Sequence, residues 1–204
     1  MPQFPPLRAA VFLDRDGTVN EQMGYINHIS RFHLFPEAGP AIRLLNERGV
    51  PAVLVTNQSG LARGYFPESL LDRVHRLMEE ELARQGARFD GIYVCPHHPE
   101  AREERFRVDC DCRKPKPGLL LRAAAELGLD LGRSYMIGDR LSDIRAAAGV
   151  GSCGVMVLTG YGRGDMEYLA PARQIQPAHV AEDLFAAVRW VLADLDARTA
   201  GRRP

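Results

Sequence analysis

The chain has 204 residues, of which 46% are hydrophobic and 25% charged, values typical of a soluble globular protein with a sizeable core. Lys plus Arg and Asp plus Glu number 26 each, so the net charge gives no indication of nucleic-acid binding. No apolar stretch is long enough to cross a membrane, and the proline-rich start lacks a secretory signal. We therefore expect a cytoplasmic protein without membrane or nucleic-acid partners.

Short apolar runs alternate with segments of helical periodicity, the pattern of βαβ units that build a mostly parallel sheet. The predicted strands are Ala9–Leu13, Ala52–Thr56, Gly91–Cys95, Ser134–Gly138 and Gly154–Leu158. The predicted helices are Glu37–Arg48, Pro67–Gln85, Pro117–Gly128, Leu141–Ala148 and Val180–Ala197, followed by a frayed tail, Arg198–Pro204. We expect one α/β domain over residues 1–204, with its core from about 9 to 197.

Asp14 and Asp16 stand one residue apart at the end of the first predicted strand, directly before Gly17. Two carboxylates at the end of a buried strand are costly to desolvate unless a cation compensates their charge. Mg²⁺ prefers such oxygen ligands and commonly acts together with a phosphate. We interpret Asp14 as a nucleophile toward phosphorus, and Asp16 as the acid and base that protonates the leaving oxygen and then activates water. The alternative is that both acids cap a turn.

Asp14, Thr56 and Asp139 each end a separate predicted strand. In an open parallel sheet, ligands bind outside the carboxyl ends of the strands, so we expect the three side chains to converge. The Thr56 hydroxyl and the backbone N–H groups after it could bind phosphate oxygens, although the segment could also be a plain polar turn. Asp139 would complete the Mg²⁺ ligand set with Asp14 and Asp16. Asp143 is interpreted as an acid at a helix N-terminus or beside the metal ligands.

Two basic residues, Arg113 and Lys114, precede a pair of prolines just before a predicted helix. A lysine held in such a rigid segment can balance the charge on a transferring phosphoryl group, and we assign this role to Lys114. The planar guanidinium of Arg113 suits the far end of a substrate. Lys116 is expected to be exposed. Arg63 could be a phosphate ligand, but we favour a surface charge at a helix start.

Soft metal ligands gather in one loop, residues 95–112, which we call the zinc loop. Its candidate ligands are Cys95, His97, Cys110 and Cys112. Three thiols and one imidazole are a complete tetrahedral set for structural Zn²⁺, which leaves no open position for catalysis. Cys110 and Cys112 are too close in sequence to pair easily, and disulfides are rare in cytosolic proteins. His98 is the competing imidazole and is interpreted as a neighbour of the zinc site or a surface residue.

The segments DRDGT, TNQSG, CRKP and GDR-SD, in this order, resemble the four motifs of haloacid dehalogenase-superfamily phosphatases. The likeness spans roughly residues 9 to 158. It implies a Rossmann-like core with little cap, a catalytic Mg²⁺, an aspartyl-phosphate on Asp14 and acid–base chemistry by Asp16.

The longer segments TNQSGLARG, CPHHP and CDCRKP are similar to those of the heptose 1,7-bisphosphate 7-phosphatases of that superfamily. This resemblance implies a phosphorylated sugar as substrate. The substrate contacts that it implies, beyond Thr56 and Lys114, are Gln22, Met23, Gly24, Tyr25, Asn57, Gln58, Ser59, Arg113 and Arg140. Two alternatives stay open: hydrolysis of histidinol phosphate, by analogy with a domain that carries a similar zinc loop, and a zinc-stabilised binding protein without catalysis. A monomer is the default expectation.

Overall fold

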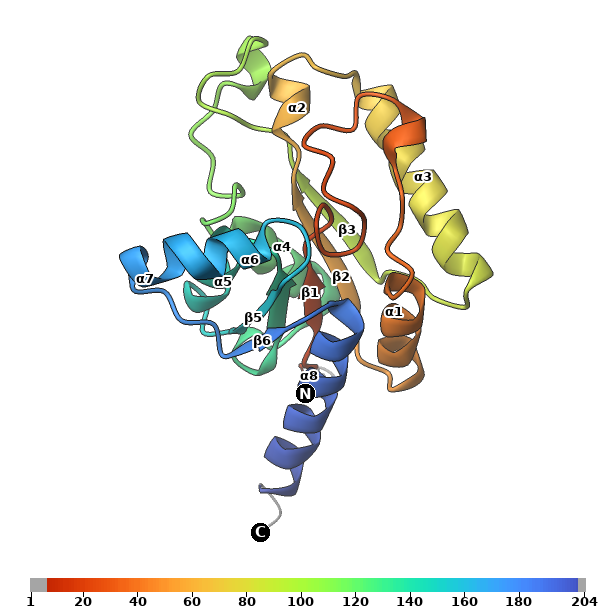
Figure 1. Ribbon diagram of the computed structural model, residues 1–204, viewed down its shortest axis with the longest axis vertical. Helices are drawn as coiled ribbons and strands as arrows, with labels where there is room; N and C mark the ends of the chain where they lie inside the picture. The colour runs from red at the N-terminus through yellow and green to blue at the C-terminus, as the bar shows by residue number, and fades with distance from the viewer. Residues whose placement is uncertain (1–6, 202–204) are drawn as a thin grey trace, which may run out of the picture.

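The computed structural model describes residues 7–201, and its core is one parallel β-sheet (Figure 1). Hydrogen-bonded neighbours follow the order β3-β2-β1-β4-β5-β6. The strands are β1 (Val11–Leu13), β2 (Ala52–Asn57), β3 (Gly91–Cys95), β4 (Tyr135–Gly138), β5 (Cys153–Val157) and β6 (His179–Ala181). The first five match the predicted strands closely, and the predicted α/β fold is confirmed.

β1 lies in the middle of the sheet, at the point where the strand order reverses. Its residue Val11 pairs with Ala52 of β2 on one side and with Tyr135 of β4 on the other. The chain builds the sheet outward from β1 to β3 and then crosses back to begin again at β4. In open parallel sheets, such a reversal creates a crevice at the carboxyl ends of the strands. The residues that follow β1, β2 and β4 therefore meet at one edge.

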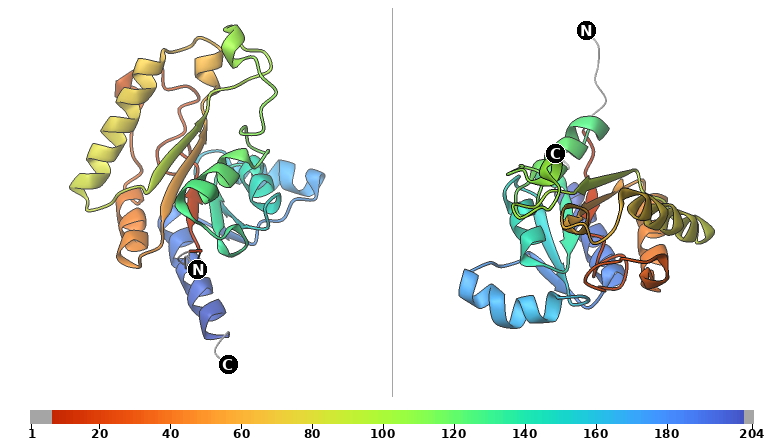
Figure 2. Two further views of the ribbon diagram at one scale, coloured as in Figure 1. Left: turned by 180° about the vertical axis from the view of Figure 1, so that it is seen from behind. Right: turned by 90° about the horizontal axis from the view of Figure 1, so that it is seen from above.

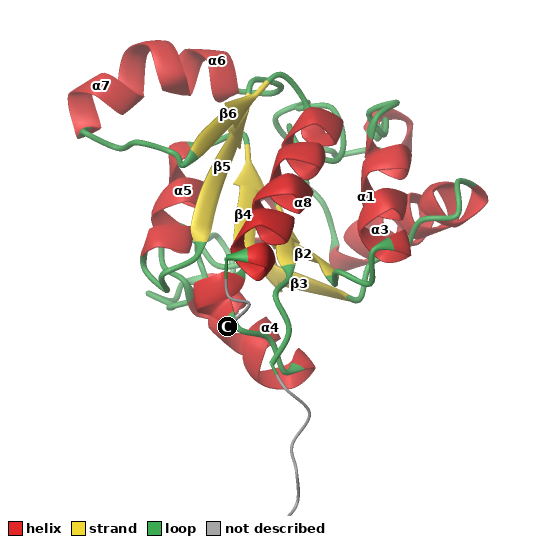
Figure 3. Ribbon diagram, turned by 90° about the horizontal axis from the view of Figure 1, so that it is seen from below, coloured by secondary structure: helices red, strands yellow, loops and turns green. Residues whose placement is uncertain are grey.

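Helices cover both faces of the sheet, because successive side chains of a strand point to opposite sides. Val11 and Leu13 belong to one buried apolar cluster, whereas Phe12 belongs to another. The first face carries α1 (Ala38–Glu47) and α8 (Leu184–Ala200), with α3 (Glu68–Arg84) beside α1, and the second carries α4 (Gly118–Leu127) and α5 (Leu141–Ala148) (Figure 3).

The long helix α3 has the apolar face that its sequence predicts. Its buried residues are Leu70, Leu71, Val74, Met78 and Leu82, at helical spacing. His75 follows Val74 directly and is half-buried, so its imidazole lies at the margin of this apolar face rather than in open solvent.

The C-terminal part of the chain differs from the prediction. Val180, predicted to start the last helix, lies instead in β6, which pairs with β5 through Val155 and His179. The helix α8 begins at Leu184, because the Asp183 carboxylate accepts a 2.8 Å hydrogen bond from the Ala186 N–H and caps the first turn.

The same helix continues further than expected, to Ala200, so the predicted fraying from residue 198 is wrong up to that point. The end of the predicted tail, residues 202–204, lies outside the described residues, as does the proline-rich start, residues 1–6.

Several short helical segments were not predicted, and most of them stand at or above the carboxyl edge. They are η1 (Ile29–Arg31), α2 (Ser59–Ala62), η2 (Glu104–Phe106), η3 (Leu131–Arg133), α6 (Gly162–Gly164), η4 (Asp165–Leu169) and α7 (Ala170–Arg173). The continuous run α6–η4–α7 and the helix α3 extend to opposite sides of the sheet (Figure 2). Among residues 7–201, no helix combines the length and apolarity that a membrane span needs.

Candidate active site

A cavity of about 450 Å³ opens at the carboxyl edge of the sheet. Most of the predicted site residues line it: Asp14, Asp16, Gln22, Gly24, Tyr25, Thr56, Asn57, Gln58, Ser59, Arg113, Lys114 and Arg140. Met23 is not among the lining residues, because its long apolar side chain packs against the hydrophobic core. The structure thus places Met23 beside the cavity but not in its lining, and a substrate contact at Met23 stays a prediction.

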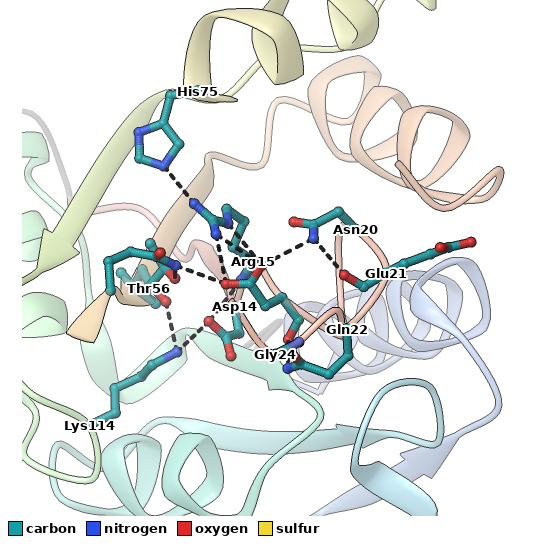
Figure 4. A network of polar contacts seen from close by, with 12 residues as sticks. Asp14, Arg15, Asn20, Glu21, Gln22, Gly24, Thr56, His75 and Lys114 are labelled. Atoms are coloured by element: carbon teal, nitrogen blue, oxygen red, sulfur yellow. Dashed lines mark hydrogen bonds and ion pairs between the residues drawn. The ribbon is translucent and has the colours of Figure 1, made fainter. Parts of the chain in front are cut away.

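Lys114 joins three parts of the chain at the base of the cavity (Figure 4). Its Nζ lies 2.8 Å from Asp14 Oδ1, at the end of β1, and 2.8 Å from Asp143 Oδ1, on α5. It also donates a 2.8 Å hydrogen bond to the carbonyl oxygen of Val55 in β2. Lys114 is only 4% exposed and Asp143 is fully buried, so these charges balance one another instead of being solvated.

Asp143 has two functions in this arrangement. Its Oδ2 accepts a 3.1 Å hydrogen bond from the Arg140 N–H, which caps α5 as the sequence suggested. Its Oδ1 holds Lys114, a contact that the sequence did not predict. Asp139 directly follows β4 and Asp143 lies in the first turn of α5, so the signal that could have placed both acids at the site is a helix that starts directly after a strand end.

Burial dominates the electrostatics of the buried acids. It raises the pKa of Asp14 to about 6, although the charge of Lys114 opposes the shift. Burial, followed by the charges of Asp14 and Asp143, raises the pKa of Asp139 to about 8. Burial lowers the pKa of Lys114, but the two carboxylates beside it outweigh that effect and leave its pKa raised. The site thus holds more buried carboxylates than a single lysine can balance.

This imbalance fits a divalent cation. Asp14, Asp139 and Asp143 each place one carboxylate oxygen within 4.8 Å of the others. Asp139 Oδ1 is buried and has no hydrogen-bond partner within residues 7–201. A buried carboxylate oxygen without a donor is destabilising unless a cation binds it, and a group of carboxylate oxygens suits Mg²⁺. Asp143, rather than the side chain of Asp16, completes this group.

The carboxylate of Asp16 is held by a separate set of donors. Arg15 Nη2 lies 2.9 Å from both of its oxygens. Asn20 Nδ2 donates to Oδ1 at 3.1 Å, and Gln58 Nε2 donates to Oδ2 at 2.8 Å. Both oxygens of Asp16 accept hydrogen bonds at the cavity wall, and Asp16 lies outside the carboxylate group of Asp14, Asp139 and Asp143, so its role as a metal ligand stays a prediction. These contacts leave Asp16 beside the cavity as a group that could move a proton.

The end of β2 organises the site through its amide side chains. Gln58 Nε2 also donates a 2.9 Å hydrogen bond to Thr56 Oγ1, so Gln58 connects the strand end to Asp16. Asn57 Oδ1 accepts from the Lys114 N–H at 3.1 Å, and Asn57 Nδ2 donates to the Lys114 carbonyl oxygen at 3.0 Å. The structure shows these amides holding Asp16 and Lys114 in place. Both residues also line the cavity, and the substrate contacts that the resemblance implied for them stay predictions.

Two glycines and one tyrosine enclose Asp139. Gly17 and Gly160 have positive φ angles of 86° and 55°, and a Cβ on either would overlap the Asp139 carboxylate. Asp139 Oδ2 accepts a 2.8 Å hydrogen bond from the Tyr161 N–H. The Tyr161 ring also lies 4.5 Å from the Arg140 guanidinium, a cation–π contact at the cavity wall. Tyr161 is therefore part of the site, although no sequence motif singled it out.

The four predicted ligands of the zinc loop come together beside the cavity. The Cys110 Sγ lies 3.6 Å from the Cys95 Sγ and 3.2 Å from the Cys112 Sγ. His97 Nδ1 lies 3.3 Å from the Cys112 Sγ and 3.8 Å from the Cys95 Sγ. With Zn–S bonds of about 2.3 Å, tetrahedral ligand atoms are roughly 3.8 Å apart, whereas a disulfide is about 2.05 Å long. Burial raises the pKa of the Cys95 thiol, so a bound cation is needed to hold it as a thiolate.

The zinc loop also positions the basic residues that follow it. Arg113 Nη1 donates a 3.2 Å hydrogen bond to the His97 carbonyl oxygen, which joins the cavity wall to a candidate zinc ligand. His98 stays outside the Cys/His group and lies 2.9 Å, through Nε2, from Arg63 Nη2. Both His98 and Arg63 line the cavity, so Arg63 is not the plain surface charge that the sequence suggested.

Comparison with known proteins identifies the family. Residues 111–187 match the HAD-hydrolase-like family model. A D-glycero-beta-D-manno-heptose-1,7-bisphosphate 7-phosphatase from Photorhabdus laumondii is 47% identical over 154 residues, which are 76% of this chain and 81% of that protein. The chain belongs to the heptose bisphosphate phosphatase family. The family's protein from Escherichia coli K12 is 48% identical over 153 residues, 74% of this chain and 80% of that protein.

A solved member of the heptose bisphosphate phosphatase family agrees in fold. The D,D-heptose 1,7-bisphosphate phosphatase from B. bronchiseptica, complexed with magnesium and phosphate, has a TM-score of 0.81 and 34% identity. The match covers 91% of this chain and 99% of that one. Magnesium is thus present in a structural relative whose fold this chain shares along nearly its whole length.

Proposed function

We propose that the chain removes the 7-phosphate of D-glycero-β-D-manno-heptose 1,7-bisphosphate and leaves the 1-phosphate in place, with residues 1–204 acting as one monomeric phosphatase domain. The observation that carries this proposal is the buried ion pair of Lys114 with Asp14 at the base of a cavity, in a chain nearly half identical to phosphatases of this name. The β anomer is the one for which these relatives are named.

The chemistry begins with Asp14. Its carboxylate attacks phosphorus as the bond to the C7 oxygen breaks, and Asp16 gives its proton to that oxygen. The aspartyl-phosphate is then hydrolysed: Asp16 takes a proton from water, the water oxygen bonds to phosphorus, and phosphate leaves Asp14. Lys114 Nζ, 2.8 Å from Asp14, balances the phosphoryl charge. The Thr56 oxygen already accepts from Gln58, so its O–H is free to donate to a phosphate oxygen.

Mg²⁺ would be held by Asp14 and Asp139, with Asp143 beside them. It would neutralise the buried carboxylates and the phosphoryl oxygens together. The unpartnered oxygen of Asp139 and the shortage of positive charge in this part of the site support the assignment.

The rest of the cavity suits a second phosphate. Besides Lys114 and Arg15, whose guanidinium is engaged with Asp16, four further cationic side chains line it, those of Arg63, Arg113, Arg140 and Arg173. A sugar bisphosphate presents an anion at each end, which these guanidinium groups can bind in a bidentate manner. Histidinol phosphate instead presents an ammonium group at its far end, which like charges would repel. The cavity therefore favours the bisphosphate over the histidinol-phosphate alternative.

The test is phosphate release, with and without Mg²⁺, from both anomers of the heptose bisphosphate and from histidinol phosphate. We expect Mg²⁺-dependent release of one phosphate from the β anomer, with the 1-phosphate retained in the product. Preference for histidinol phosphate would keep the mechanism but overturn the substrate. No Mg²⁺-dependent release from any of the three would support the binding-protein alternative.

For the second metal we propose structural Zn²⁺ on the zinc loop, held by Cys95, His97, Cys110 and Cys112. The ligand spacing and the chemistry of three thiols and one imidazole support it. Protein purified without added metal should contain about one zinc per chain. Its thiols, apart from Cys153, should react with a thiol reagent only after a chelator has removed the metal. Absence of zinc together with four freely reactive thiols in folded protein would contradict this prediction.

A further inference from the structure

The residue between the two catalytic aspartates, Arg15, is buried in an unusual position for a guanidinium group. It is 2% exposed, and its Nη2 contacts both oxygens of Asp16, with Nε 3.3 Å from Oδ1. One edge of the planar guanidinium thus faces Asp16. The remaining nitrogen, Nη1, needs an acceptor of its own, because a buried donor without a partner is destabilising.

That acceptor comes from α3, sixty residues further along the chain. Arg15 Nη1 lies 3.3 Å from His75 Nε2, and Figure 4 shows the imidazole reaching down from the helix toward the guanidinium. Arg15 thus links two side chains: it contacts His75 on one side and Asp16 on the other. None of the sequence motifs includes His75.

We propose that His75 is a positioning residue for the acid–base step, which it serves by anchoring Arg15 so that the guanidinium holds Asp16 at the cavity wall. This inference rests on the proposed function, since it takes Asp16 to be the group that protonates the leaving oxygen. His75 does not line the cavity and therefore acts only through Arg15.

The imidazole can accept from Arg15 only in its neutral form. Burial, and next the charge of Arg15, lower the pKa of His75 to about 4, although the charge of Asp16 opposes the shift. The ring is therefore neutral at the pH at which such a phosphatase is assayed. Contacts on both sides of the Arg15 guanidinium restrict its movement and so fix the position of Asp16. A shift of about 1 Å in a catalytic group can change a rate by about 100-fold.

The test uses the difference between leaving groups. A sugar alkoxide needs a proton from Asp16 to leave, whereas a nitrophenolate leaves without one. The measured quantity is kcat/KM, which reports formation of the aspartyl-phosphate, for the heptose bisphosphate and for p-nitrophenyl phosphate. We expect His75→Leu to lower kcat/KM for the heptose bisphosphate by about 10- to 100-fold. The kcat/KM for p-nitrophenyl phosphate should change little. His75→Gln, whose amide oxygen can accept from Arg15, should restore most of the loss.

Two further variants separate the possible failures. Arg76→Gln changes the exposed neighbour on α3 and should behave as wild type. Asp16→Asn, like His75→Leu, should lower kcat/KM for the sugar more than for the aryl ester, and by a larger factor. Suppose that Asp16→Asn lowers kcat/KM for the sugar more than for the aryl ester. If His75→Leu then lowers kcat/KM for both substrates equally, or for neither, the positioning role of His75 is overturned while the proposed function stands. If Asp16→Asn itself does not discriminate, Asp16 is not the acid, and both the acid assignment and this inference fail.

Discussion

Replacing Asp14 by Asn is expected to lower kcat by at least about 10⁴-fold, the scale on which enzymes with covalent mechanisms lose activity when the nucleophile is removed. The amide has nearly the shape of the carboxylate but cannot form a bond to phosphorus at neutral pH. Lys114 keeps its ion pair with Asp143 and its hydrogen bond to the Val55 carbonyl oxygen, so the base of the cavity retains its packing. The loss should therefore be one of chemistry and not of fold.

The same substitution should stabilise the metal-free protein at neutral and alkaline pH. Asp14 has its folded-state pKa raised from 3.8 to about 6, so its contribution to stability is complete below about 3.8 and is lost as the pH rises through about 6. At pH 8 the ionised carboxylate therefore destabilises the fold by roughly 3 kcal/mol, from about 1.36 kcal/mol for each pKa unit. Asparagine carries no such charge.

Two measurements check this pair of effects. Melting curves of metal-free protein should place Asp14→Asn above the wild type at pH 8 and close to it at pH 4. Mass spectrometry of acid-quenched turnover mixtures should find one added phosphoryl group on the peptide that contains Asp14, in wild type only. Asp72→Asn, an exposed acid on α3, serves as the control for purification and assay. Activity of Asp14→Asn near that of the control, free of contaminating phosphatase, would exclude Asp14 as the nucleophile.

Five of the six strands described could be predicted because their apolar runs are short, separate and bounded by glycine or proline, whereas the short β6 was taken for the start of a helix. The run Gly162–Arg173 was missed for the opposite reason, since Gly162, Gly164 and Pro171 are residues typical of loops. Its folding depends on tertiary contacts, among them the buried Asp165 carboxylate, which accepts a 2.9 Å hydrogen bond from the Leu141 N–H at the start of α5. No local pattern contains that information.

The site also has parts that local sequence patterns predict and parts that depend on tertiary contacts. Asp14, Thr56 and Asp139 were predicted because each directly follows an apolar run, and parallel strands bring such positions to one edge. The zinc loop was predicted because ligand type and spacing alone define the set. What could not be predicted is which donor each acid meets: Asp143 holding Lys114, Gln58 bridging Thr56 to Asp16, and the contact of Arg15 with α3. These pairs are joined by register and helix rotation, which a single sequence does not reveal.

Replacing Lys114 by Met should lower both the activity and the stability of the protein. Methionine fills a similar volume but has no charge, so Asp14 and Asp143 lose their buried counter-charge and the Val55 carbonyl oxygen loses its donor. Removing one partner of a buried ion pair costs about 3–5 kcal/mol. Loss of a charge that stabilises the transition state lowers kcat by about 10²- to 10³-fold. We expect the free energy of unfolding and kcat to fall by these amounts.

The pH dependence distinguishes lost charge balance from simple loss of packing. The raised pKa values of Asp14 and Asp139, about 6 and about 8, mean that the metal-free acids ionise progressively as the pH rises. Ionisation of a buried acid is unfavourable, and it is more unfavourable when Lys114 is absent. The difference in the free energy of unfolding between wild type and Lys114→Met should therefore widen from pH 4 to pH 8. A packing defect would leave the gap constant.

Lys116→Met is the matched control, two residues away in the same proline-bounded segment. Lys116 pairs with Asp109 at the surface, with its side chain 43% exposed, so its replacement should change the unfolding free energy by no more than about 0.5 kcal/mol. Urea unfolding of both variants at several pH values, alongside turnover of the heptose bisphosphate, tests the prediction. If Lys114→Met were no less stable than Lys116→Met at pH 8, the buried carboxylates would have another source of compensation than Lys114.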